Sequence, residues 1–360
     1  VTTVNGQSVD GNSISFKALE KITVEGEVLD ASGQLVTDFT GIVNPTVKDS
    51  KVTVTCLKNS NKDDSPAFTF TDYPNTIFIG NDSVRNGKFS FTFTVPKDIS
   101  YSNLQGKMNL YAVDTESGNE AQGNFDNFIV GGTSDTAETD TIGPEIRALY
   151  LNDTTFVDGG QVNTTPYFVA ELWDKSGVNI TGSSVGHDMM LVIDESTVLS
   201  YNLNSYYELL PGEDGTGIVK FPIPALEPGK HTAEFWVWDI LNNSTVRTFT
   251  FEVVEGLKPF LFDVIATPGI AREQVTFHLM HNRPESRMRV GIMVYDLAGR
   301  QLWKHEESGT SGLFENYTVS WDLTSGGARM RPGVYIYRAA ISTDNSKDAT
   351  KARKFIILGE

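Results

Sequence analysis

The feature that most constrains the fold is an alternation of apolar and polar residues near the end of the chain. Between Val290 and Ser342 the segments VGIMVYDLAGRQLW, ENYTVSWDLTSGG and RPGVYIYRAAIS follow one another. A period of two residues places alternate side chains on opposite faces of a β-strand. Turn residues separate the segments, namely Leu297, Ala298, Gly299, Gly326, Gly327, Pro332 and Gly333. The pattern predicts a small antiparallel β-sandwich.

Length and residue usage extend this prediction to the rest of the chain. The 360 residues exceed one ordinary sandwich and predict two to three domains. No long window keeps a 3.6-residue apolar period, so we expect an all-β protein with little helix. No apolar run reaches the roughly 18 residues that a membrane-spanning helix needs.

The net charge of the chain limits the kinds of molecule that it can be expected to bind. The 46 acidic and 29 basic residues give a net charge of −17, and the sequence pI is about 4.7. Such a chain repels nucleic-acid phosphates and anionic membrane surfaces, so we do not expect it to bind nucleic acid. Because no apolar run is long enough to span a bilayer, we expect no direct membrane insertion either. The simplest interpretation is that the acidic excess keeps a secreted β-protein soluble. We expect no cofactor, except that acidic loops leave calcium binding open.

The single cysteine, Cys56, lies in VTVTCLKN, where the alternation places it on a strand. One cysteine cannot form an internal disulfide, and no histidine is near it in the sequence, so we expect it to fill the core rather than to act as a nucleophile. The chain begins at Val1 without a signal peptide, which we interpret as a fragment of a longer protein.

Segments rich in turn-forming residues divide the chain into three predicted domains. Each is expected to be an antiparallel, immunoglobulin-like β-sandwich, and the three follow one another in the sequence. They span residues 1–132, 145–256 and 257–360. Residues 133–144, within GGTSDTAETDTIGP, contain no apolar run and form the predicted linker between the first two domains.

For two strands the sequence predicts which side chains are buried. In FSFTFTV, the core-facing residues are predicted to be Phe89, Phe91, Phe93 and Val95, whereas the water-facing ones are Ser90, Thr92 and Thr94. In HTAEFWVWD, both faces are apolar, through Phe235, Trp236, Val237 and Trp238. The second pattern predicts a central strand that is covered on both sides.

Ordered phrases of the second domain resemble the region after the peptidase domain in the PorU-like sortases, gingipain-related cysteine peptidases of the type IX secretion system. The phrases are GP at 143 and 144, YLND from Tyr150, DGG from Asp158, D-x-SG from Asp174, GHD from Gly186, PALEPGKH from Pro224 and WDILNNS from Trp238. The first domain adds VEGEVLDASGQLVTDFTG and IFIGNDSVRNGKFSFTFTVPKDISY.

The third domain resembles FlgD-like immunoglobulin folds and the carboxy-terminal sorting domains of the Bacteroidetes. One departure is its first turn, where residues 266–269 read Ala-Thr-Pro-Gly instead of the usual Pro-Asn-Pro type. A Pro-Gly turn serves the same geometry. The likeness therefore covers nearly the whole chain.

The resemblance implies a parent protein that cleaves sorting domains from secreted cargo and transfers the cargo to a lipopolysaccharide anchor. Its nucleophile and histidine would lie upstream of residue 1, so this chain itself is expected to hold no catalytic, cofactor-binding or metal-binding residues. The implied location is the extracellular face of the outer membrane. The implied partners are the parent peptidase domain and outer-membrane subunits of the secretion system.

Two other functions stay open. The chain could be a secreted cargo protein whose last domain is a sorting signal, cleaved near residues 256–261. It could also be a carbohydrate-binding or adhesin-like surface protein, for which exposed aromatic side chains flanked by amides would be needed.

The five histidines give no metal-binding pattern. His278 and His281 are the closest pair, and their spacing puts them on opposite faces of a straight strand, although the Asn-Arg-Pro that follows favours a turn. His187 and Asp188 stand at the start of a strand in GHDMMLVID. We expect one of these two to hydrogen-bond the SGVNITGSSVG loop to the sheet, and catalysis is the weaker interpretation because no nucleophile is placed beside them.

Three acidic loops are the candidates for calcium, which takes six to eight oxygen ligands. Their acidic residues are Asp135, Glu138, Asp140, Asp153, Asp158, Glu213 and Asp214. None of the loops matches the EF-hand spacing, and a solvated turn explains each of them as well. Tyr206 and Tyr207 in NLNSYYELL are either a docking surface or a pair of which one packs on the sheet edge.

Overall fold

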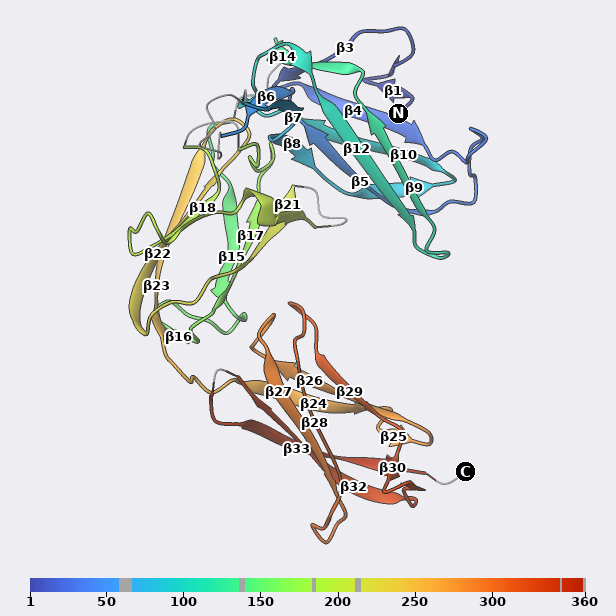
Figure 1. The fold of residues 1–360 in the computed structure, drawn as a ribbon, viewed down its shortest axis with the longest axis vertical. Coiled ribbons are helices and arrows are strands. Elements are labelled where there is room, and N and C mark those ends of the chain that lie inside the picture. Colours follow the sequence, from blue (N-terminus) through green and yellow to red (C-terminus); the bar gives the residue numbers. More distant parts are fainter. Residues whose placement is uncertain (58–66, 136–139, 183–185, 211–214, 344, 359–360) are drawn as a thin grey trace. The chain divides into compact units, whose positions relative to one another are not determined.

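The structure is a computed structural model that describes residues 1–57, 67–135, 140–182, 186–210, 215–343 and 345–358. These residues form β-strands, turns and one 3₁₀ turn, η1 (Asn204–Tyr206), with no α-helix among them (Figure 1). None of them forms a helix with the length and hydropathy of a membrane span. The fold is all-β, with several β-sandwich domains, as predicted.

The chain divides into two compact units, which we describe separately. The first consists of Val1–Ala148, Ala170–Val219 and Ala233–Thr248, and the second of Leu149–Val169, Lys220–Thr232 and Phe249–Glu360. The division into three domains with boundaries at residues 132, 144 and 256 stays a prediction.

The amino-terminal part of the first unit contains a nine-stranded and a three-stranded sheet that share a core. The larger sheet has the order β13 (Glu120–Phe125), β12 (Lys107–Asp114), β5 (Gly41–Lys48), β9 (Asp82–Arg85), β10 (Lys88–Thr94), β4 (Lys21–Glu27), β1 (Thr3–Val4) and β2 (Gln7–Ser8), with β8 (Thr76–Ile79) beside β5. The smaller sheet consists of β11 (Leu104–Gln105), β14 (Phe128–Thr133) and β3 (Ile14–Ala18).

Strand β10 confirms the predicted alternation. The side chains of Phe89, Phe91, Phe93 and Val95 are all buried in the shared core. Ser90 and Thr92 are exposed and Thr94 is half-buried. Burial of alternate aromatic side chains is what orients this sheet, because a shift of one residue would turn all of them to water.

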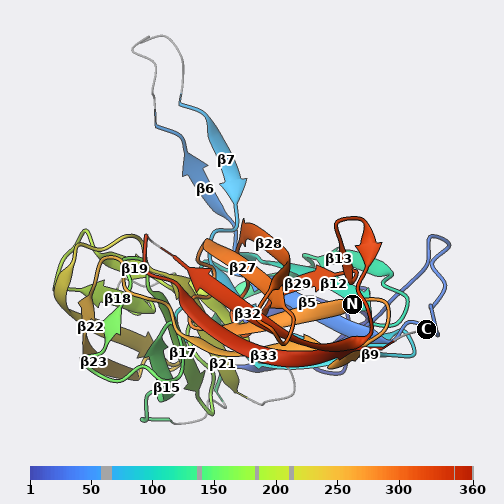
Figure 2. The same ribbon diagram turned by 90° about the horizontal axis from the view of Figure 1, so that it is seen from below.

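A separate two-stranded ribbon, β6 (Val52–Thr55) and β7 (Thr69–Asp72), corrects the expectation for Cys56. Figure 2 shows the ribbon standing apart from the neighbouring strands. Strand β6 ends before Cys56, whose side chain is exposed. The prediction that Cys56 fills the core is wrong because the ribbon has no buried face: β7 is exposed throughout, and Phe68 beside it is 69% exposed.

Two further sheets follow in the sequence. One has the order β15 (Glu145–Leu151), β17 (Tyr167–Trp173), β21 (Thr216–Pro222) and β20 (Tyr207–Leu209), and the other β16 (Gln161–Val162), β23 (Ser244–Val253), β22 (Gly229–Trp238), β18 (Met190–Ile193) and β19 (Ser200–Asn202). Strand β22 is central, as predicted, and Phe235 and Val237 are fully buried. Its other face is only partly covered, since Trp236 and Trp238 are half-buried.

The carboxy-terminal strands lie in the second unit. One sheet has the order β24 (Leu261–Thr267), β26 (Val275–His281) and β29 (Tyr317–Trp321), a second β25 (Ile270–Ala271), β33 (Ala349–Ile357), β32 (Gly333–Ser342), β27 (Met288–Tyr295) and β28 (Gln301–Gly309), and β30 (Thr324–Ser325) pairs with β31 (Ala328–Arg329). The strands predicted between Val290 and Ser342 are all present. The turn before β28 is closed by Asp296, whose Oδ1 accepts hydrogen bonds from the backbone N–H groups of Ala298 and Arg300.

The sheets are not purely antiparallel, which differs from the prediction. Three short strands pair in parallel with a strand far along the chain: β3 with β14, β16 with β23 and β25 with β33. In the last two cases the preceding strand, β15 or β24, belongs to the other sheet. The chain therefore crosses from one sheet to the other after β15 and after β24. The short strand that follows becomes the edge strand of the second sheet and runs parallel to its neighbour.

Candidate functional site

Three aspartates from separate segments of the first unit converge at one point. Asp174 follows β17, Asp239 follows β22, and Asp140 precedes β15. One carboxylate oxygen from each lies within 4.8 Å of the others. Asp174 and Asp239 are buried, at 4% and 0% exposure, and Asp140 is half-buried.

Local turns orient the two buried carboxylates. Oδ1 of Asp174 accepts the backbone N–H groups of Ser176, at 2.7 Å, and Gly177, at 2.9 Å. Oδ1 of Asp239 accepts those of Leu241, at 2.9 Å, and Asn243, at 2.7 Å. Both are turns in which an aspartate side chain replaces a backbone acceptor, so each strand end holds its carboxylate firmly.

Hydrogen bonds also attach Asp140 to both of these turns. The Ser176 hydroxyl donates to Oδ2 of Asp140 at 2.9 Å. The side-chain amide of Asn243 donates to the carbonyl oxygen of Asp140 at 3.1 Å and to Oδ2 of Asp239 at 2.7 Å. The segment that precedes β15 is therefore held by the loops after β17 and β22.

The carboxylates perturb one another electrostatically. Burial is the main cause that raises the pKa of Asp174 to about 6, and the charges of Asp239 and Asp140 act in the same direction. Burial likewise raises the pKa of Asp239, with a further contribution from the charge of Asp140. The backbone N–H of Ile142 is the main cause that lowers the pKa of Asp140. The site thus concentrates negative charge on carboxylates that are largely buried.

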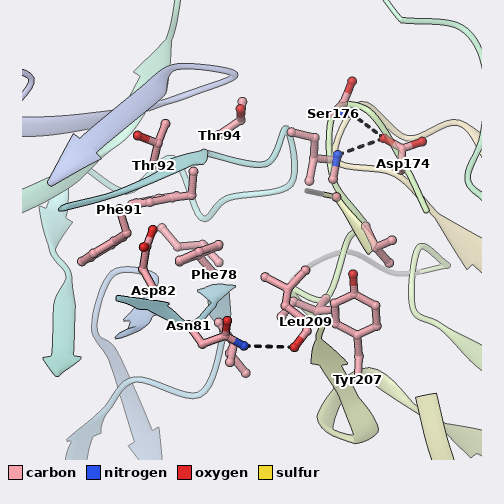
Figure 3. A pocket seen from close by; sticks show the side chains of 18 of the residues that line it. Phe78, Asn81, Asp82, Phe91, Thr92, Thr94, Asp174, Ser176, Tyr207 and Leu209 are labelled. Carbon is pink, nitrogen blue, oxygen red and sulfur yellow. Dashed lines mark hydrogen bonds between the residues drawn. The ribbon is translucent and has the colours of Figure 1, made fainter. Parts of the chain in front are cut away.

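Asp174 also lines a cavity of about 780 Å³ within the first unit (Figure 3). One wall carries Phe78 of β8 and Phe91 of β10, and the opposite wall carries Asp174, Tyr207 and residues near them. The amide of Asn81 donates to the carbonyl oxygen of Leu209 across the cavity at 3.0 Å. Polar and apolar groups therefore both line the cavity.

A second polar cluster surrounds the buried carboxylate of Asp98, in the segment after β10. Nδ1 of His187 lies 2.6 Å from Oδ2 of Asp98. The side-chain amide of Asn242 donates to Oδ1 at 2.8 Å, and that of Asn179 to Oδ2 at 3.3 Å. The His187 ring also packs on Trp238, with ring centroids 4.5 Å apart.

These contacts correct the interpretation of His187 and Asp188. Among the described residues, neither side chain links the SGVNITGSSVG loop directly to the sheet: His187 pairs with Asp98, and Asp188 accepts the side-chain amide of Asn204 at 2.7 Å. Asn204 in turn accepts the backbone N–H of Met189 and so organises the start of η1. The partners lie far from GHD in the sequence, which is why the pattern did not reveal them.

The other histidines have separate surroundings. His278 and His281 both lie within β26, on opposite faces, so the predicted turn begins only after His281. Nε2 of His281 lies 2.8 Å from the Ser311 hydroxyl, and its Nδ1 accepts the backbone N–H of Arg283 at 3.1 Å. His305 lies 2.9 Å from a carboxylate oxygen of Glu307.

Of the nominated acidic residues that the structure describes, only Asp140 belongs to the three-carboxylate cluster. Asp153 closes its own turn by accepting the backbone N–H of Thr155, and Asp158 accepts that of Thr250. Asp135 is exposed. Glu138, Glu213 and Asp214 lie outside the described residues.

Burial distinguishes the two tyrosines predicted in the NLNSYYELL segment. Tyr206 is 39% exposed whereas Tyr207 is 5% exposed, so one tyrosine of the pair packs inside.

The sequence interpretation missed Asp174 and Asp239 as candidate ligands. A signal for them existed, because each aspartate directly follows a tryptophan at the end of a strand and is followed by turn-forming residues.

Comparisons with known proteins include a solved structure of appreciable sequence identity. No protein-family model matches the chain, and no curated protein does. A crystal structure of dimeric latent PorU from Porphyromonas gingivalis is 38% identical over 100% of this chain, which corresponds to 34% of that chain, with a TM-score of 0.43.

Two other solved structures illustrate the general similarity to tandem β-sandwich proteins. The Ig1-2 module of the Drosophila receptor protein tyrosine phosphatase DLAR is 10% identical, over 60% of this chain and 98% of that chain, with a TM-score of 0.24. The FN1-FN3 domains of chicken CNTN1 are 8% identical, over 96% of this chain and 99% of that chain, with a TM-score of 0.21. On sequence identity over its full length, the chain is PorU-like and corresponds to about a third of the PorU chain.

Proposed function

We propose that the chain is the non-catalytic carboxy-terminal β-sandwich region of a PorU-like cysteine peptidase, the sortase of a type IX secretion system. In this role it supports and docks an upstream peptidase domain at the outer face of the outer membrane, beside other subunits of the secretion system. The observation that carries the proposal is 38% identity to PorU over the entire chain.

The surroundings of the cysteine and histidines support a non-catalytic role. Cysteine catalysis needs a thiolate beside a base and donors for an oxyanion. Cys56 is exposed at the end of a ribbon, and its backbone N–H donates to the carbonyl oxygen of Phe68. His187, His281 and His305 are engaged with Asp98, Ser311 and Glu307.

A chimeric sortase tests the docking role. In a P. gingivalis strain without PorU, we would express PorU in which the matching third is replaced by this chain. We expect the chimera to restore cleavage of sorting domains from secreted cargo. PorU with its own segment is the positive control, and a chimera without the peptidase cysteine is the negative control. A folded, surface-displayed chimera that leaves cargo unprocessed would contradict the proposal.

An activity assay on the purified chain tests directly whether it lacks peptidase activity. We expect no cleavage of a sorting-domain peptide by the wild-type chain or by the Cys56→Ser variant. Cleavage that the Cys56→Ser variant abolishes would overturn the non-catalytic role. Recovery of the native protein cut between residues 256 and 261 would favour the cargo alternative, and binding to a glycan array would favour the adhesin alternative.

A further inference from the structure

We propose that Asp140, Asp174 and Asp239 bind one calcium ion, which fastens the segment before β15 to the loops after β17 and β22. The site is independent of the proposed sortase role. Calcium is a hard cation that takes carboxylate, carbonyl and water oxygens in irregular loop geometry. The three aspartates supply the carboxylates, and the adjoining cavity supplies room for water.

The spacing of the oxygens fits a single ion. Calcium–oxygen distances are about 2.3–2.6 Å, so two oxygens on opposite sides of one ion are separated by roughly 5 Å or less. The three carboxylate oxygens lie within 4.8 Å of one another. One ion can therefore contact all three without a change in the backbone of the strands that carry them.

The charges around the site also call for a cation. Oδ1 of Asp174 is occupied by two backbone N–H groups, whereas its Oδ2 has no hydrogen-bond partner among the residues that the structure describes. The charge of Lys175 acts on Asp140, which leaves the three carboxylates with an excess of negative charge. Buried anions are costly unless they are paired or bind a metal ion.

A side chain outside the cluster points to a ligand as well. Tyr207 of β20 is 5% exposed and lines the same cavity as Asp174. Figure 3 shows its hydroxyl at the end of the ring nearest Asp174. Among the described residues this hydroxyl forms no hydrogen bond, and it is not one of the side-chain atoms sealed from solvent, so it opens onto the cavity. A calcium-bound water in the cavity would satisfy it, because calcium sites commonly keep water among their ligands.

Terbium luminescence tests the site, because Tb³⁺ replaces Ca²⁺ and is sensitised by nearby tryptophan. Trp173 and Trp238 directly precede two of the proposed ligands. We expect the wild-type chain to sensitise one equivalent of Tb³⁺ and calcium chloride to displace it. We also expect 10 mM calcium to raise the Tm of the chain by several degrees over that in chelator, because a ligand that binds only the folded state stabilises it.

The Asp174→Asn variant separates metal binding from folding. An asparagine keeps the acceptor oxygen for Ser176 and Gly177 but removes a charge from the cluster. In chelator the variant should melt at the same temperature as the wild type or higher, and calcium should no longer raise its Tm. The matched control, Asp153→Asn, removes one acidic charge from a loop outside the cluster and should keep the full calcium response.

Two results would overturn the proposal. The first is a wild-type chain that shows neither calcium-displaceable terbium luminescence nor a calcium-dependent Tm. The second is an Asp174→Asn variant that responds to calcium as strongly as Asp153→Asn does.

Discussion

At the scale of single residues, His281 is a histidine that the fold keeps neutral. Its Nδ1 accepts the backbone N–H of Arg283, and its Nε2 lies against the Ser311 hydroxyl. Burial is the main cause that lowers the pKa of His281 to about 4, and the charge of Arg283 acts in the same direction. Protonation would remove the acceptor that the backbone N–H of Arg283 uses.

This pKa predicts a loss of stability in mild acid. A base with a lowered pKa in the folded state contributes its full stability above its unfolded value of 6.5, and the contribution is lost as the pH falls toward 4. The shift corresponds to roughly 3 kcal/mol. In urea unfolding at pH 7.5 and 4.5, the wild type should lose more stability than His281→Asn. A variant at the opposite face, His278→Asn, should retain the wild-type pH dependence, and equal losses in all three proteins would contradict this assignment.

At the scale of elements, strand β10 contributes to the stability of the fold mainly through the side chains on its buried face. Phe91 is 3% exposed in the shared core, whereas Thr92 is exposed and shares a hydrogen bond with Thr23 of β4, with the hydroxyl oxygens 3.0 Å apart. We expect Phe91→Ala to lower the free energy of unfolding by about 3–5 kcal/mol, because it removes buried apolar contacts and leaves a cavity.

The neighbouring Thr92→Ala variant is the control for that prediction. It should cost less than about 1 kcal/mol, since it removes an exposed side-chain hydrogen bond. Both values come from urea unfolding followed by tryptophan fluorescence. Similar losses in the two variants would show that the core does not depend on the alternation.

The contrast between β10 and the β6–β7 ribbon explains what sequence patterns could predict. Alternation identifies a buried face where the partners across the core are present, as they are for Phe91. The same alternation continues through VTVT toward Cys56, but the ribbon packs against no core, so the cysteine is exposed. Periodicity reports the spacing of side chains along a strand and does not report whether another layer covers them.

The sequence interpretation missed two residues of the candidate metal site for a related reason. Asp140 was recognised because it lies in an acidic stretch, whereas Asp174 and Asp239 each stand alone between apolar strands and turn residues. Only the pairing of distant strands brings the three carboxylates together. A local pattern of acidic residues therefore nominated several turns and missed two of the three residues that converge.

At the scale of the whole molecule, the chain holds separate hydrophobic cores. One contains Phe91 and its neighbours in the first unit, and another contains Ile292 and its neighbours in the second. We expect calorimetry to resolve more than one unfolding transition. Phe91→Ala should lower one transition and Ile292→Ala another, and the double variant should show both shifts, because distant sites act independently. A single transition that both variants shift would contradict independent cores.

The parallel pairs at the sheet edges have a consequence for how the protein is made. Ile270 and Ala271 of β25 pair with Ile356 and Ile357 of β33, which follows β25 much later in the sequence. Such long-range contacts form late, because a long loop must close first. Synthesis from the amino terminus delivers β25 long before β33, so that edge of the sheet stays open until every residue between the two strands has left the ribosome.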